Sequence, residues 1–115
     1  MRISMLARAI PFLVAALAAP AAFSDDASIK ITAPADGAKL DAMAQNKMAY
    51  EVIPGPKGDH VHVYVDDKEQ AVLRELKGSY TFETMTAGAH SICIKIVNKG
   101  HTPIGVEKCI KVKVE

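Results

Sequence analysis

The stretch Asp59-His60-Val61-His62-Val63-Tyr64-Val65-Asp66 decides the fold of this chain. Its residues alternate strictly, so a β-strand places the three valines on one face and the two histidines and the tyrosine on the other. Three β-branched side chains on one face are typical of a strand that packs on a hydrophobic core. The stretch therefore predicts a core strand whose outer face carries two neighbouring imidazoles.

Further alternating stretches lie on both sides of this strand, separated by residues that form turns. They predict strands at residues 28–32, 38–40, 47–53, 69–73, 79–83, 89–97 and 106–114. No segment after residue 24 shows a helical period. About seven short strands with turns at regular intervals predict an all-β fold, a small antiparallel immunoglobulin-like β-sandwich, with a small barrel as the alternative. The chain has no tryptophan, and both cysteines fall in the last two strands, so the prediction concerns sandwich architecture and not immunoglobulin ancestry.

The N-terminus predicts a signal peptide over residues 1–24. Arg2 and Arg8 supply positive charge, residues 10–19 are apolar, and Ala22-Phe23-Ser24 places small residues at the −3 and −1 positions of a cleavage site. A membrane anchor is the alternative, but the apolar run is shorter than the roughly 20 residues that a span requires. We predict export to the periplasm and cleavage after about Ser24, with Ala19-Pro20-Ala21 as a second candidate site. The product is a single domain over residues 25–115 with no stable membrane insertion.

The charge of this domain gives no sign of a nucleic-acid partner. Loss of Arg2 and Arg8 reduces the 14 basic residues to 12, against 13 acidic ones, which gives a net charge of −1. The two signs are interspersed along the chain. Nucleic-acid binding and binding to an anionic membrane surface both require clustered basic residues, so we predict neither.

Cys93 and Cys109 predict a disulfide, because a pair of cysteines in an exported domain is most simply oxidised. Strands 89–97 and 106–114 should form a hairpin. If the two cysteines lie directly opposite each other, the register of this hairpin centres on His101, in the middle of the connecting loop. The alternative is a redox-active or metal-binding cysteine pair. Such pairs usually have C-x-x-C spacing, which Cys93 and Cys109 lack.

Three histidines form a candidate metal site. In a sandwich of this strand order, the loop before His60 and the loop that carries His101 emerge at the same end, so His60, His62 and His101 are expected to converge. Imidazole nitrogen suits copper, zinc and nickel. We favour copper because of the compartment and the available thioethers, with zinc as the alternative. Asp59 is a candidate oxygen ligand or a hydrogen-bond partner of an imidazole.

An alternative interpretation is that His60 and His62 are solvated polar residues on an exposed strand face. The fourth histidine, His90, opens strand 89–97 at the opposite end of the domain. Its alternation matches that of the core residues, so we predict a half-buried structural histidine that holds the adjacent corner by a hydrogen bond.

Catalytic arrangements are not evident in the sequence. The glutamates that could form a carboxylate pair lie on separate strands, and no nucleophile with a neighbouring base or glycine-rich phosphate loop is visible. We therefore predict that the protein is not an enzyme.

Several short motifs occur together in this chain: Pro34-Ala35-Asp36-Gly37 after the first strand, His60 and His62 at the central strand, Gly88-Ala89-His90, and His101-Thr102-Pro103. With them the chain resembles a group of small exported bacterial domains of unknown function that have recurrent histidines at these places. This chain differs in having two separated histidines where the group has a continuous run. The resemblance covers residues 28–114 and implies a sandwich fold and export, but no activity.

The sequence thus predicts a periplasmic, non-enzymatic binding module that binds a metal ion through histidines on its surface. The alternative is an accessory domain that contacts another envelope protein, in which the histidines have no role.

Overall fold

The computed structural model describes residues 26–115, so the predicted signal peptide lies outside the described part of the chain. Eight strands follow one another: β1 (Ser28–Ala33), β2 (Ala38–Leu40), β3 (Lys47–Ile53), β4 (His60–Val65), β5 (Lys68–Leu73), β6 (Lys77–Thr81), β7 (Gly88–Val97) and β8 (Pro103–Val114). Among residues 26–115 there is no helix that could cross a membrane.

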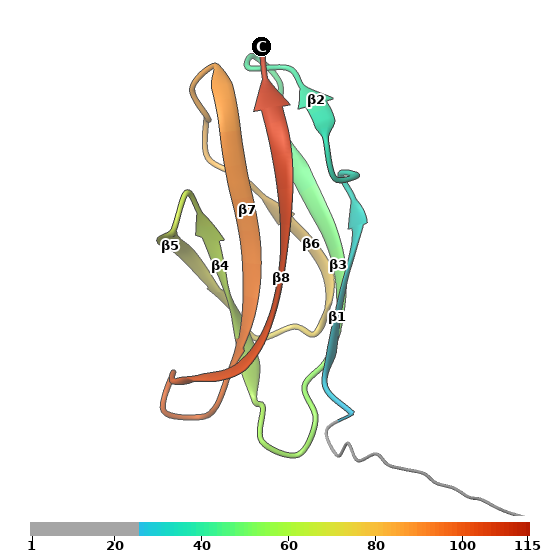
Figure 1. Cartoon of the computed structure of the whole chain (residues 1–115), viewed down its shortest axis with the longest axis vertical. Helices are drawn as coiled ribbons and strands as arrows, with labels where there is room; N and C mark the ends of the chain where they lie inside the picture. Colours follow the sequence, from blue (N-terminus) through green and yellow to red (C-terminus); the bar gives the residue numbers. More distant parts are fainter. Residues whose placement is uncertain (1–25) are drawn as a thin grey trace, which may run out of the picture.

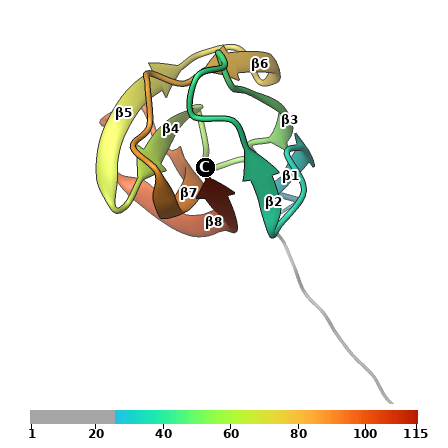
Figure 2. The ribbon, with the colours of Figure 1, turned by 90° about the horizontal axis from the view of Figure 1, so that it is seen from above.

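The strands form two sheets that face each other, as Figure 1 and the view from above in Figure 2 show. One sheet has three strands in the order β1-β3-β6, and the other has five in the order β2-β8-β7-β4-β5. Neighbouring strands are antiparallel except β2 and β8, which run parallel. The predicted β-sandwich is confirmed, and its eight strands include the short edge strand β2 expected at residues 38–40.

The core lies between the sheets and follows the alternation of the sequence. Val61 and Val63 on β4 are completely buried, as are the three alternating isoleucines of β7. The smaller sheet contributes Met48, Tyr50 and Val52 of β3, and these side chains are also buried. Each buried side chain of this size contributes about 1.5–3 kcal/mol through removal of apolar surface from water. The fold therefore depends on period-two patterning in both sheets.

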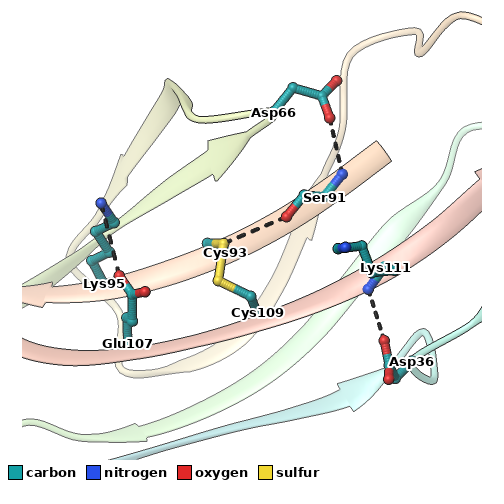
Figure 3. Close-up of a disulfide and its surroundings, with 8 residues drawn as sticks. All are labelled: Asp36, Asp66, Ser91, Cys93, Lys95, Glu107, Cys109 and Lys111. Carbon is teal, nitrogen blue, oxygen red and sulfur yellow. Dashed lines mark hydrogen bonds and ion pairs between the residues drawn. A yellow bond between two sulfur atoms is a disulfide. The ribbon is translucent and has the colours of Figure 1, made fainter. Parts of the chain in front are cut away.

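A turn after β1 carries the chain from the smaller sheet to the larger one. Gly37 adopts a φ of 86°, which glycine tolerates better than other residues. The Gly37 amide donates to the Lys111 carbonyl at 2.7 Å, and the Lys111 amide donates to Asp36 Oδ1 at 2.8 Å. The second of these contacts is visible in Figure 3. The turn is thus attached to β8, and it places β2 beside the end of that strand.

The β7–β8 hairpin carries the disulfide. Cys93 and Cys109 are direct partners in the register and are bonded to each other, as Figure 3 shows. The loop between the strands includes His101. The predicted disulfide and the predicted register of the hairpin are both confirmed.

The connection from β3 to β4 sets the position of His60. The Asp59 amide donates to the Val97 carbonyl at 2.8 Å, so β4 starts directly against the end of β7. Gly58 packs closely just before this point: a Cβ atom there would lie 2.3 Å from the Pro54 carbonyl oxygen and 2.5 Å from Ile96 Cγ2. Glycine is therefore required where the loop passes over the core.

Candidate metal centre

His60 and His62 lie on the face of β4 that points away from the core, as the alternation predicts. His60 pairs with Val97 of β7, and His62 lies between Lys95 of β7 and Val72 of β5. Nevertheless, the side chain of His60 is only 1% exposed and that of His62 only 5%. The expectation that both imidazoles face solvent is wrong, and so is the interpretation that they are solvated polar residues.

The loop between β7 and β8 explains this burial. It brings His101 against both imidazoles, and Val97, which shares the outer face with them, is completely buried as well. The loop is held by Asn98, whose Oδ1 accepts hydrogen bonds from the Gly100 amide at 2.8 Å and the Thr102 amide at 3.0 Å. His101 adopts a left-handed conformation with a φ of 67°. The outer face is therefore covered at this end by an ordered loop.

Three imidazole nitrogens converge beneath this loop. His101 Nδ1 lies 3.2 Å from His60 Nε2 and 3.1 Å from His62 Nε2, and the ligand atoms of the three residues all lie within 4.8 Å of one another. In a tetrahedral site with metal–nitrogen bonds of about 2.0–2.1 Å, ligand nitrogens are about 3.3–3.4 Å apart. Two of the three nitrogen–nitrogen distances are close to this spacing, so the three histidines could hold a metal ion.

The other nitrogen of each buried ring faces a carboxylate. His60 Nδ1 lies 2.8 Å from Asp59 Oδ2, and His62 Nδ1 lies 3.2 Å from Glu69 Oε1. Because a carboxylate accepts a hydrogen, these contacts assign the ring hydrogen to Nδ1 and leave a lone pair on Nε2 of both histidines. Metal-binding histidines are commonly oriented in this way. Asp59 therefore lies on the side of the His60 ring that faces away from the nitrogen cluster.

The cluster is poorly satisfied by hydrogen bonds alone. Two lone pairs, from His60 and His62, are directed at His101 Nδ1, which carries at most one hydrogen. One buried acceptor then lacks a full hydrogen bond, which costs about 1–3 kcal/mol. A cation would engage the lone pairs of all three nitrogens, so the donor set fits a metal ion better than it fits an internal hydrogen-bond network.

Burial favours the neutral imidazole at His62. Burial lowers the pKa of His62, the Glu69 carboxylate raises it in part, and the neighbouring His60 and His101 lower it further. The hydrogen bond from His60 lowers the pKa of Asp59, which also lies 3.6 Å from Arg74 Nη1. A neutral His62 has the lone pair that metal binding requires, and an ionised Asp59 accepts the hydrogen of His60 Nδ1.

His90 lies at the other end of β7, away from the cluster. Its Nδ1 lies 2.6 Å from Asp66 Oδ2, and its Nε2 lies 2.6 Å from the Thr86 carbonyl oxygen. Asp66 also accepts from the Ser91 amide at 2.9 Å, a contact drawn in Figure 3. Since both partners of His90 only accept hydrogens, the imidazolium form alone satisfies both contacts. The hydrogen bond from His90 to Asp66 is the main reason that the pKa of His90 is raised.

We expect the wild-type domain to lose stability, relative to a His90→Gln variant, as the pH rises above about 6.5. Because folding raises the pKa of His90, its stabilising contribution is complete below the unfolded pKa and disappears as the pH rises through the folded pKa. Asp66, whose pKa is lowered, contributes in the opposite range: its contribution is present above 3.8 and is lost as the pH falls through the lower folded value. Urea unfolding of the wild type and His90→Gln at pH values on both sides of 6.5 measures the difference in their free energies of unfolding. If this difference does not change with pH, His90 is not the imidazolium that the contacts indicate.

Comparisons with known proteins bear on the fold. Fibronectin(III)-like modules of CbhA from Clostridium thermocellum have a TM-score of 0.62 and 19% identity, covering 76% of this chain and 96% of that chain. The extracellular domain of a putative one-component system from B. thetaiotaomicron has a TM-score of 0.56 and 14% identity, covering 81% of this chain. The domain is a small immunoglobulin-like β-sandwich.

A lytic polysaccharide monooxygenase from Jonesia denitrificans also shares the fold, with a TM-score of 0.50, 11% identity and coverage of 71% of this chain. This chain spans 60% of the monooxygenase and 16% of the protein from B. thetaiotaomicron. At such identities the likeness shows the fold alone. No protein-family model matches the sequence, and a search of curated proteins finds no relative.

Proposed function

We propose that this domain is an exported, non-enzymatic binding module that holds one transition-metal ion through His60, His62 and His101, with copper as the favoured ion. The observation that carries the proposal is the convergence of three nitrogens, two of them buried and fixed in the ligand tautomer by Asp59 and Glu69. Imidazole donors suit copper, zinc and nickel, and among divalent ions copper binds such sites most tightly.

Two observations support export. The Cys93–Cys109 disulfide is the form that cysteines take in oxidising compartments, and a structural neighbour is an extracellular domain. The signal peptide predicted from residues 1–24 agrees with this, and we propose the periplasm as the compartment.

Calorimetric titration of residues 25–115 with Cu(II) and Zn(II) tests the proposed function. We expect one ion per chain with micromolar or tighter affinity, and loss of this binding in a His60→Ala/His62→Ala variant. His60 and His62 are buried, so their replacement could also disturb folding. A His101→Ala variant changes an exposed loop residue instead. It should also lose tight binding, while its circular dichroism remains that of the wild type. His90→Gln is the matched control and should bind normally. If the wild-type protein binds neither ion, the metal-binding proposal fails and the accessory-domain alternative remains.

The carboxylate behind His62 provides a separate prediction. We expect Glu69→Gln to weaken metal binding by about 10- to 100-fold, because the variant loses the charged acceptor that orients the ring and increases its basicity. Competition with a chelating dye measures the affinity. Glu51→Gln is the control: Glu51 lies on β3 in the other sheet, where it pairs with Lys77. Equal affinities for the two variants would show that Glu69 does not orient a ligand.

A further inference from the structure

We propose that an ion held by His60, His62 and His101 retains one coordination position for a small exogenous anion. The inference rests on the proposed function and concerns what the same centre binds besides the metal. Within residues 26–115, the group of converging histidine, cysteine and acidic side chains contains these three residues and no fourth. A four-coordinate ion therefore needs one more donor.

The side chains that most often complete such a site are engaged elsewhere. The carboxylates of Asp59 and Glu69 contact the Nδ1 atoms of His60 and His62, on the opposite side of each ring from the Nε2 lone pair. Both cysteines are oxidised to the disulfide. Met48 and Met85 are buried in the core cluster between the sheets, whereas the imidazoles project from the outer face of β4.

Charge and exposure favour an anion in the remaining position. Three neutral imidazoles leave the double positive charge of a divalent ion uncompensated within its coordination shell. The ion would lie at the outer face of the sheet, next to His101, whose side chain is exposed. An accessible metal site with three protein ligands typically binds water or another exchangeable ligand at its fourth coordination position.

Tyr64 is a nearby side chain whose hydroxyl could compete with an external ligand. Its ring centroid lies 6.5 Å from that of His62, and Lys95 Nζ lies 4.5 Å from the centroid of the tyrosine ring. A Tyr64→Phe variant therefore distinguishes a position filled by the protein from one that is open to solvent.

The experiment uses residues 25–115 loaded with one equivalent of Cu(II), freed of unbound copper and titrated with sodium azide. We expect a new azide-to-copper charge-transfer absorption band and an altered electron paramagnetic resonance spectrum, both saturable and the same in Tyr64→Phe. Metal-free protein should show no band. If copper binds at one equivalent and azide changes neither spectrum, or changes them only in Tyr64→Phe, the open position is refuted while the metal site stands. If copper does not bind, or binds equally well to His101→Ala, the proposed function itself fails.

Discussion

The Gly58→Ala variant is expected to be about 3 kcal/mol less stable than the wild-type domain, because the position has no room for a methyl group. The added Cβ would lie 2.3 Å from the carbonyl oxygen of Pro54 and 2.5 Å from Ile96, a completely buried side chain. Relief of these contacts requires movement of the β3–β4 loop. His60 follows two residues later, so the variant should also bind metal more weakly. Urea unfolding monitored by circular dichroism measures the change in stability.

Gly100→Ala is the matched control for this prediction. A Cβ at Gly100 would meet only the Asn98 side-chain oxygen, at 3.4 Å. Its effect should remain within about 0.5 kcal/mol, as for most surface substitutions. If the two variants were equally stable, the close packing at Gly58 would be refuted.

Reduction of the Cys93–Cys109 disulfide is expected to lower the free energy of unfolding by about 3 kcal/mol, the chain-entropy value for a loop of this size. The two cysteines are 16 positions apart and pair directly across β7 and β8. In a domain of this size, whose total stability falls within about 5–15 kcal/mol, this is a substantial share. Chemical denaturation with and without reductant measures the effect.

The control for this prediction is a Cys93→Ala/Cys109→Ala variant, which has no disulfide to reduce. Its stability should be the same with and without reductant and close to that of the reduced wild type. A wild-type domain whose stability does not respond to complete reduction, verified by thiol titration, would contradict the prediction.

The core and the register of the β7–β8 hairpin could both be predicted from local features of the sequence. Val61 and Ile94 belong to strands in which every second residue is β-branched, so these side chains share one face of the strand. They are buried when the faces of the two sheets pack together. The register of β7 and β8 followed from two separate signals, the cysteine pair and the loop around His101. The alternation, the cysteine pair and the turn residues are all patterns that a single sequence contains.

The burial of His60 and His62 could not be read from the same periodicity. Alternation gives the face on which a side chain lies, but not what covers that face. The cover is the β7–β8 loop, whose path depends on hydrogen bonds to the Asn98 side chain and on a left-handed conformation at His101. Asparagine followed by glycine two residues later indicates a turn, but does not show the direction in which the loop folds.

Glu69 was missed as a partner of His62 for a related reason. Its position depends on the pairing of β4 with β5, which contains an irregularity between Val63 and Tyr64. Glu69 pairs with Tyr64, two residues along the same face from His62. The signal that could have identified Glu69 is an acidic residue on the strand next to β4, on the same outer face as His62.

The β7–β8 hairpin is held by the disulfide, which does not depend on an ion, and this would separate the proposed metal binding from folding. In small zinc domains the apo chain is unfolded, so binding and folding are one event. Here the covalent link joins the strands on both sides of the His101 loop, and the loop is held by Asn98 without an ion, so the sheets do not depend on one. If the proposed ion is held here, it could therefore exchange while the two sheets stay folded.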